Sequence, residues 1–145
     1  MDVVWAMQAP ELLGNLPEEY KVTVGTTNGE VLLSLNNNQE PFDDPRVRQA
    51  VAYAIDRDAA NDIVFDGLAT DTGGAPVSPT DPWFKDKDYF PHDPDKAAQL
   101  LADAGARGAE LTITAPTLPY AQSLSEFLYS ELTRVGFKVK LESAE

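Results

Sequence analysis

The chain has 145 residues, a formal net charge of -13 and no cysteine. The acidic balance disfavours binding to nucleic acids and to anionic membrane surfaces, both of which recruit clustered lysine and arginine, and the lack of cysteine excludes disulfides and thiolate metal sites. Its length and its hydrophobic fraction of 43% indicate one globular domain over residues 1–145 with a real core.

Short strands are predicted in the first third of the chain. Residues 3–5 suit a strand, and residues 9–16 suit one or two helical turns. Residues 21–25 and 30–35 then alternate apolar with polar side chains on either side of Asn28–Gly29, and Asn-Gly is a strong signal for a hairpin turn. We therefore expect an antiparallel hairpin here.

A helix is predicted to begin at Pro45, after the asparagines Asn36, Asn37 and Asn38 interrupt the strand. Asp44 is placed to cap this helix by accepting hydrogen bonds from backbone N–H groups, and proline suits the first helical position because its missing N–H costs nothing there. Carboxamides at the end of a strand can hydrogen-bond the backbone of a ligand, but they equally satisfy loose backbone groups where the strand stops. The apolar face of the helix comprises Val47, Ala50, Val51, Ala54 and Ile55.

The next segment is predicted to contain a second helix and a long loop. Residues 57–65 suit a short helix with its last apolar residues, 63–65, buried. Residues 70–91 follow as the longest irregular stretch, and a loop of this length is either functional or pinned by its aromatic side chains. We expect pinning, with Trp83 packed on the core, although a tryptophan on a loop could also stack on a ligand.

The last third of the chain predicts a helix followed by a strand, a helix and a strand. Asp93 precedes a proline and repeats the cap arrangement, and Gly105 suits the left-handed residue that ends a helix. Residues 110–115 and 137–141 alternate as strands on either side of a helix predicted for residues 121–135. A strand–helix–strand unit of this kind usually pairs its strands in parallel. With the expected hairpin, the chain therefore predicts an α/β fold, a mixed sheet flanked by helices.

Two stretches of the chain resemble sequence signatures of the family 5 extracellular solute-binding proteins, the peptide- and nickel-type receptors of ABC importers. The resemblance covers nearly the whole chain and is strongest over residues 32–141. The matching residues of the first stretch are Asn37, Pro41, Phe42, Asp43, Asp44, Pro45, Arg46, Val47, Arg48, Gln49, Ala50, Tyr53, Ala54, Ile55, Asp56 and Arg57. Those of the second stretch are Phe90, Asp93, Pro94, Lys96, Ala97, Leu100, Leu101, Ala104 and Gly105.

The resemblance implies a fold, a function and partners. The chain would be one lobe of a type II periplasmic-binding-protein fold, within the C-terminal half of a two-lobed receptor that closes on its solute. Such receptors are not enzymes and use no cofactor; we expect a monomer that binds a small solute such as an oligopeptide or nickel and docks on ABC permease subunits. They work outside the cytoplasm, in the periplasm or anchored at the cell surface as lipoproteins. Since the family begins with an export signal that residues 1–145 lack, we expect a domain fragment of a longer protein.

Catalysis and metal binding have little support in the residues. His92 is the single histidine, so a serine–histidine–aspartate triad would have to use it, and no nucleophile-elbow pattern precedes a helix. The candidate ligand-binding residues are therefore Asn36, Asn37, Asn38 and Trp83, with no metal or cofactor. The alternative function is a free-standing acidic α/β domain that binds a basic protein partner. EF-hand spacing is absent from the acidic cluster of Asp81, Asp86, Asp88, Asp93 and Asp95.

Overall fold

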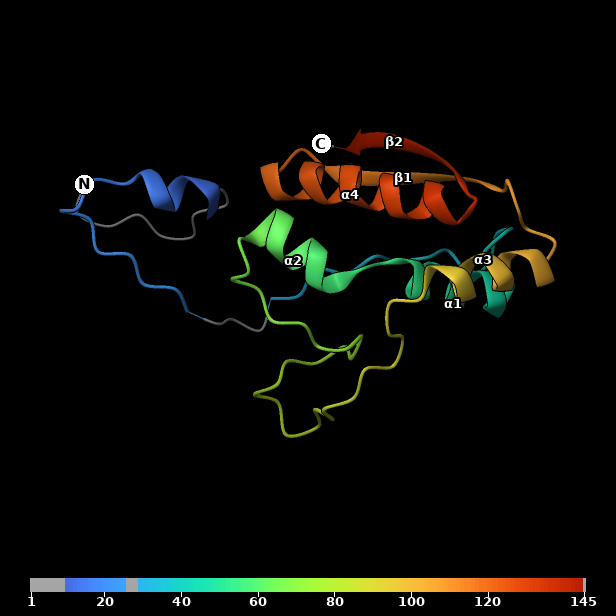
Figure 1. The fold of residues 1–145 in the computed structure, drawn as a ribbon, viewed down its shortest axis with the longest axis horizontal. Helices are drawn as coiled ribbons and strands as arrows, with labels where there is room; N and C mark the ends of the chain where they lie inside the picture. The colour runs from blue at the N-terminus through green and yellow to red at the C-terminus, as the bar shows by residue number, and fades with distance from the viewer. Residues whose placement is uncertain (1–9, 26–28, 145) are drawn as a thin grey trace.

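The computed structural model describes residues 10–25 and 29–144, so the strand predicted at residues 3–5 lies outside the described part. Figure 1 shows the arrangement of the elements. None of the helices among the described residues is long and apolar enough to cross a membrane. In chain order the elements are the 3-10 helix η1 (Pro10–Asn15), α1 (Pro45–Ala54), α2 (Arg57–Phe65), α3 (Pro94–Asp103), β1 (Glu110–Pro116), α4 (Pro119–Val135) and β2 (Lys138–Ala144).

Aspartate side chains begin α1, α2 and α3. The Asp44 Oδ1 atom accepts a hydrogen bond from the Arg46 backbone N–H at 2.8 Å, and the Asp93 Oδ1 atom accepts one from the Lys96 backbone N–H at 2.9 Å. Both predicted caps are confirmed, and each precedes a proline in the first turn of its helix. Asp56 caps α2 in the same way, although sequence reasoning did not assign it.

The two strands form one small parallel sheet. β1 pairs with β2 in a register that runs from Glu110 opposite Lys138 to Pro116 opposite Ala144. This pairing confirms the parallel strand–helix–strand unit predicted for the last third of the chain. The connecting helix α4 ends at Gly136, whose φ of 117° lies in the left-handed region that glycine adopts without steric cost.

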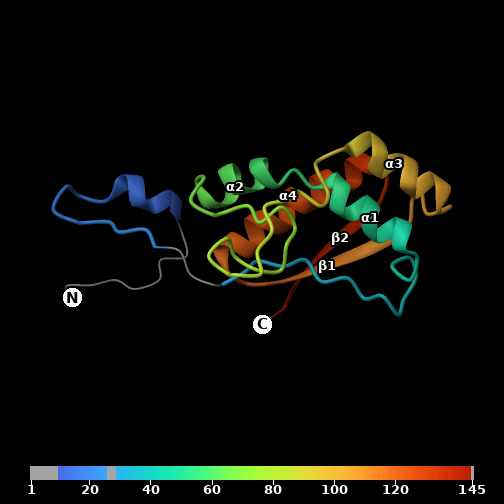
Figure 2. The same cartoon turned by 90° about the horizontal axis from the view of Figure 1, so that it is seen from below.

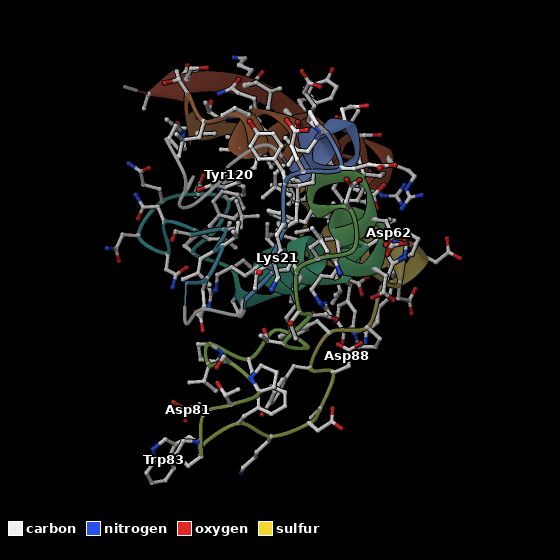
Figure 3. All side chains as sticks on the ribbon, turned by 90° about the vertical axis from the view of Figure 1, so that its left-hand side faces the viewer. Lys21, Asp62, Asp81, Trp83, Asp88 and Tyr120 are labelled. Atoms are coloured by element: carbon white, nitrogen blue, oxygen red, sulfur yellow. The ribbon has the colours of Figure 1, made fainter. Side chains whose placement is uncertain are left out.

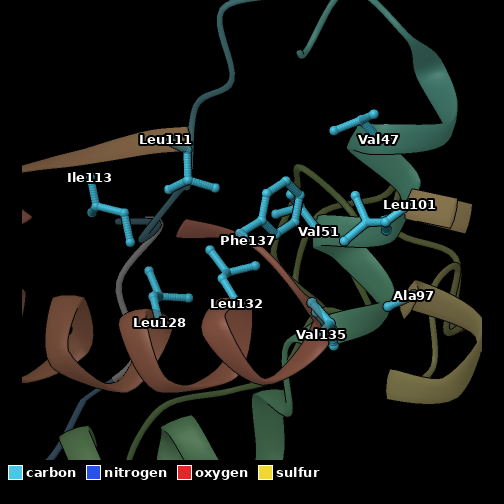
Figure 4. Packing of buried hydrophobic residues seen from close by; sticks show 12 residues of the cluster. Val47, Val51, Ala97, Leu101, Leu111, Ile113, Leu128, Leu132, Val135 and Phe137 are labelled. Atoms are coloured by element: carbon cyan, nitrogen blue, oxygen red, sulfur yellow. The ribbon is translucent and has the colours of Figure 1, made fainter. Parts of the chain in front are cut away.

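The core lies where α1, α3, β1 and α4 meet. Every second side chain of β1 is buried, and Figure 4 shows Leu111 and Ile113 pointing from β1 toward Leu128 and Leu132 of α4. Burial of these apolar surfaces supplies the main favourable term for folding. The buried cluster comprises Val47, Ala50, Val51, Ala54, Ala97, Leu101, Leu111, Ile113, Leu128, Leu132, Val135 and Phe137.

The predicted antiparallel hairpin is wrong, because residues 20–25 and 29–36 carry no strand in the structure. Val24 is 58% exposed and Leu32 is 69% exposed, so the alternating apolar residues stay largely in solvent. The physical reason is that a strand needs hydrogen bonds to the backbone of a neighbouring strand. An alternating pattern indicates only that one face of the segment can be buried. The described sheet is therefore parallel rather than mixed, while the α/β class is confirmed. Asn28, in the predicted turn, lies outside the described residues.

α2 buries one narrow stripe of side chains. Ala60 and Val64 are 8% and 5% exposed, whereas Ile63 is 67% exposed. The predicted burial of residues 63–65 is therefore right for Val64 and wrong for Ile63, while Phe65 is half-buried. Ala60 and Val64 are four residues apart and therefore lie on the same face of α2, which packs against α4. Ile63 lies beside that face and stays in solvent.

Replacing Leu132 with alanine tests the core. Leu132 is 1% exposed, and Leu132→Ala should lower the free energy of unfolding by about 2–5 kcal/mol because it leaves a cavity in the packed interior. Urea unfolding followed by circular dichroism measures the difference. Leu68→Ala is the matched control, since Leu68 is 45% exposed, and it should cost less than about 0.5 kcal/mol. Equal losses in the two variants would contradict the assigned core.

Candidate functional site

The three asparagines form an exposed turn between the extended residues 29–36 and α1. The Asn36 Oδ1 atom accepts a hydrogen bond from the Asn38 backbone N–H at 3.1 Å, and the Asn36 carbonyl accepts one from the Gln39 N–H at 3.2 Å. Asn36 therefore stabilises the local turn, as one of the two interpretations of this cluster expects. The side chains of Asn37 and Asn38 are exposed, so they are available to a ligand or to water.

Trp83 lies at the tip of the long loop between α2 and α3 (Figure 3). It is 82% exposed, so the expected packing of Trp83 on the core is wrong. Local turns fix the tip instead: the Trp83 N–H donates to Asp81 Oδ1 at 2.7 Å, and the Phe84 N–H donates to the Asp81 carbonyl at 3.0 Å. These local turns hold the tip of the loop, and the exposed indole is free to stack on a ligand.

The base of this loop is pinned, mainly by one arginine. Arg57 of α2 donates from Nε to Asp71 Oδ1 at 2.9 Å, from Nη2 to Asp88 Oδ1 at 2.7 Å, and from Nη1 to the Phe90 carbonyl at 2.8 Å. Burial lowers the pKa of the Arg57 guanidinium, but the hydrogen bonds and charges of Asp71 and Asp88 outweigh burial, and the net change in pKa is upward. Phe90 also packs edge-on against Tyr53, with ring centroids 5.4 Å apart. One aromatic residue of the loop therefore pins it as predicted.

The charged side chains before and within α1 bind other parts of this domain. Arg46 donates from Nη2 to Asp44 Oδ2 at 2.6 Å, and from Nη1 to the Asp103 carbonyl at the end of α3 at 2.7 Å. Arg48 donates to the Phe42 carbonyl at 2.7 Å. The side-chain hydrogen bonds from Arg46 hold the pKa of the Asp44 carboxyl below its usual value, and the Arg46 backbone N–H acts in the same direction. These residues therefore join α1, α3 and the turn before α1.

His92 lies among charged side chains of α2 and α4. Its Nδ1 atom is 3.3 Å from Asp56 Oδ2, and its Nε2 atom is 3.1 Å from Arg134 Nη2 and 3.6 Å from Glu131 Oε2. Glu131, which is 8% exposed, also accepts a hydrogen bond from Arg134 at 2.8 Å. This cluster ties the start of α2 to α4. Across residues 10–25 and 29–144, no group of His, Cys, Asp and Glu side chains is arranged to hold a metal ion.

A further polar group lies where both strands end and α4 begins. The Gln122 Nε2 atom donates to the Pro116 carbonyl at 3.0 Å and to Ser143 Oγ at 3.4 Å, so one side chain of α4 joins the last residues of β1 and β2. α4 begins after Leu118 without a side-chain cap. We call Pro116, Leu118, Gln122 and Ser143 the carboxyl edge. Open α/β sheets bind their ligands in the crevice outside the carboxyl ends of the strands.

The structure does not bring the sequence-predicted site residues together. Figure 2 shows the turn before α1 and the C-terminal end of β2 at opposite ends of the sheet, and Figure 3 shows Trp83 projecting on its loop. Sequence reasoning missed Gln122 and Ser143. A signal was present, because a strand–helix–strand unit places the end of its first strand, the start of its helix and the end of its second strand at one edge.

Comparison with known sequences identifies relatives of this chain. The model for the middle region of the bacterial extracellular solute-binding proteins, family 5, matches residues 2–145. The glutathione-binding protein GsiB of Escherichia coli (strain K12) is 35% identical over 115 residues, which are 78% of this chain and 22% of that protein. GsiB of Pectobacterium atrosepticum is 36% identical over 121 residues, with the same two shares. The chain therefore spans about a fifth of the length of the curated relatives it matches.

Solved structures show the same fold. The periplasmic binding protein AgaA from A. tumefacien R10, in complex with agropinic acid, is 37% identical with a TM-score of 0.69, over 76% of this chain and 23% of that one. The periplasmic binding protein DppA from Helicobacter pylori, in complex with the peptide STSA, is 29% identical with a TM-score of 0.71, over 77% of this chain and 22% of that one. The described α/β fold is therefore that of part of a periplasmic binding protein.

Acid should weaken the contact between Asp44 and Arg46. Because folding lowers the pKa of Asp44 from 3.8, its contribution to stability is present above that unfolded value and is lost as the pH falls through the lower folded value. Asp44→Asn keeps a capping side chain but removes the charge. The stability difference between the unaltered chain and Asp44→Asn should be largest at neutral pH and shrink below pH 3.8. Urea unfolding at several pH values measures it, and a difference independent of pH would contradict the assignment.

Removing the Arg57 side chain should free the long loop. Without Arg57, Asp71 and Asp88 keep only local bonds to backbone N–H groups, and one backbone hydrogen bond, from Tyr89 to Gly73, still joins the two arms. The loop should therefore open more often, and trypsin should cut after Lys85 and Lys87 roughly tenfold faster than in the unaltered chain. Mass spectrometry of timed digests measures the rate. Arg57→Lys is the matched control, because an ammonium keeps the charge but lacks the fork that reaches three acceptors, and its rate should be intermediate. An unchanged rate in Arg57→Ala would show that the pinning lies elsewhere.

Proposed function

The chain belongs to the family 5 bacterial extracellular solute-binding proteins, and from that membership we propose that it is one lobe of a receptor that binds a small solute for an ABC importer. The observation that carries this proposal is the family match over residues 2–145. Because the chain corresponds to 22% of the length of GsiB, a solute held by a protein of that size would be enclosed by more than these residues. Closure of two lobes around the solute then buries it.

The proposed solute is a short peptide or a peptide-like molecule. GsiB is named for glutathione, which is itself built from three amino acids, and the DppA structure holds the peptide STSA. AgaA holds agropinic acid, so the class extends to other small acids. Nickel, which the sequence resemblance also allowed, is less favoured because no group of metal-ligating side chains is assembled in the described residues.

The carboxyl edge is the proposed contact for the solute on this lobe. The Gln122 side-chain amide donates to the Pro116 carbonyl and to Ser143 Oγ. Its carbonyl oxygen therefore remains as an acceptor, and the Ser143 hydroxyl can still donate a hydrogen bond. Neutral donors and acceptors of this kind pair with the amides and carbonyls of a peptide backbone. The turn of Asn36–Asn38 and the exposed Trp83 are the alternative contacts, the first through carboxamides and the second by stacking.

The same membership supports proposals about partners and location. We propose that a receptor-length protein containing this chain docks on ABC permease subunits and is a monomer. It would work outside the cytoplasm, in the periplasm or at the cell surface as a lipoprotein. It binds without catalysis and without a cofactor, since GsiB and DppA are binding proteins. The free-standing interaction domain is not favoured, because it leaves the family match without an explanation.

Titrating this chain with glutathione and with the peptide STSA tests whether this lobe holds only half of the solute site, the half-site proposal. One lobe supplies only part of the contact, and every 1.4 kcal/mol of lost binding energy weakens affinity about tenfold. A solute that a whole receptor binds at roughly micromolar concentration should therefore bind this chain at roughly millimolar concentration or weaker. Amide shifts in NMR spectra should change at Leu118, Gln122 and Ser143.

A pair of glutamine variants sharpens the titration. Gln122→Ala should abolish the shift changes at the carboxyl edge, whereas Gln99→Ala on α3 should leave them intact. Shift changes confined to Asn36–Asn38 or to Trp83 would move the site to those residues. Saturation at micromolar solute would show that this lobe holds a complete site, and the half-site proposal would then fail.

A further inference from the structure

The two ring nitrogens of His92 face partners of opposite kinds. Nδ1 lies 3.3 Å from Asp56 Oδ2, and Nε2 lies 3.1 Å from Arg134 Nη2. An ionised carboxylate only accepts hydrogen bonds, whereas a guanidinium only donates them. A neutral imidazole has one N–H and one lone pair, so these partners require the proton on Nδ1 and the lone pair on Nε2. The contacts therefore specify which neutral tautomer His92 adopts.

Protonation of His92 makes this arrangement unstable, because both ring nitrogens then donate. Arg134 can no longer bond to Nε2, and the two positive charges repel each other. The structure places an acceptor beside Nε2, since Glu131 Oε2 lies 3.6 Å away. A small rotation of the ring or of the carboxylate closes that distance to a hydrogen bond. Nε2 therefore has a different partner for each of its two protonation states.

Glu131 is the group for which His92 and Arg134 compete. Its Oε2 atom, the one beside His92, also accepts the hydrogen bond from Arg134 at 2.8 Å. The Glu131 side chain is 10% exposed, and a charge that is nearly buried lowers stability unless it is paired. The Arg134 side chain is 51% exposed, so it can turn into water while Glu131 stays in place.

The other charged side chains around His92 already have partners. Arg57 of α2 is held by the long loop, and Asp93, the next residue along the chain, caps α3. Lys96 of α3 donates to the Tyr53 hydroxyl of α1 at 2.7 Å. The contacts of the imidazole with the start of α2 and with α4 are therefore the ones that change when the ring gains a proton.

We propose that His92 is a proton-driven switch that exchanges the partner of Glu131. When His92 is neutral, Arg134 bonds to both Glu131 and Nε2. When His92 is protonated, it takes over Glu131 and releases Arg134 into solvent. Histidine is the side chain whose charge ordinarily changes between about pH 5 and pH 8, so the exchange follows the acidity of the surroundings.

The protonated state joins more of the domain than the neutral state does. His92 then lies as a positive charge between Asp56, which caps α2, and Glu131 of α4, so that a carboxylate is held on each side of the ring. His92 also ends the long loop, two residues after the Phe90 carbonyl that Arg57 holds. Acid therefore fastens the end of this loop and the start of α2 to α4. None of these groups belongs to the carboxyl edge, so the exchange takes place whether or not the chain binds a peptide.

NMR of the imidazole nitrogens tests the tautomer and the exchange directly. His92 is the single histidine of the chain, so its ring signals are unambiguous. In mild alkali, Nδ1 should have the shift of a protonated nitrogen and Nε2 that of an unprotonated one. As the ring gains its second proton, the proximity signals between the ring and the Arg134 side chain should be lost. A neutral ring with its proton on Nε2, or a protonated ring that keeps its contact with Arg134, would overturn the proposal.

Stability measurements on Arg134→Gln test the competition for Glu131. At about pH 8 this change should raise the unfolding equilibrium constant roughly tenfold, because Glu131 loses a charged hydrogen-bond donor. At about pH 5 the increase should shrink to about twofold or less, since protonated His92 replaces the donor. Arg107→Gln is the matched control, because Arg107 is exposed and its replacement removes the same charge. It should change the equilibrium constant little at either pH.

The same substitution in a His92→Gln background decides between two sources of the pH dependence. Glutamine cannot gain a proton, so the effect of Arg134→Gln should there be the same at both pH values. An effect that shrinks equally in acid without His92 would assign the change to protonation of Glu131 itself and would overturn the proposal. An effect of Arg134→Gln that does not depend on pH when His92 is present would contradict it as well.

Discussion

The packing of α4 against the rest of the domain is the contact on which this structure depends. α4 is the element that contacts both strands and each of the helices α1, α2 and α3. Its buried face places Leu132, 1% exposed, against the core side of β1. Because the sheet described here has only two strands, it cannot bury both faces and both edges by itself, and α4 supplies the cover for one face. The carboxyl edge follows from where α4 lies, because Gln122 of α4 joins the ends of β1 and β2.

Two arginines of the first sequence signature, Arg46 and Arg57, hold the fold of this lobe together. Arg46 bonds to Asp44 and to the Asp103 carbonyl, and Arg57 holds both arms of the long loop. Both guanidinium groups donate to acceptors within the domain. Arg46 thereby joins α1 to α3, and Arg57 joins α2 to the long loop.

The elements that the sequence predicted correctly carry both a local start signal and a partner within the chain. α1 has the Asp44 cap and a buried stripe, and the parallel strands have the helix that connects them. The hairpin failed because residues 20–25 and 29–36 hold the pattern of a strand but lack a neighbour among the described residues. The position of Trp83 could not be predicted, because it depends on where a proline-rich loop goes in space. Gln122 and Ser143 required the register of two strands, which local patterns do not contain.

The central claim is that this chain is one lobe of a receptor and that further parts of the receptor complete its solute site. A crystal structure of the receptor-length protein with a bound peptide tests that claim most directly. The account predicts a peptide beyond the carboxyl ends of β1 and β2, with a polar contact to Gln122 or Ser143. A peptide held at the asparagine turn or against Trp83 would contradict it.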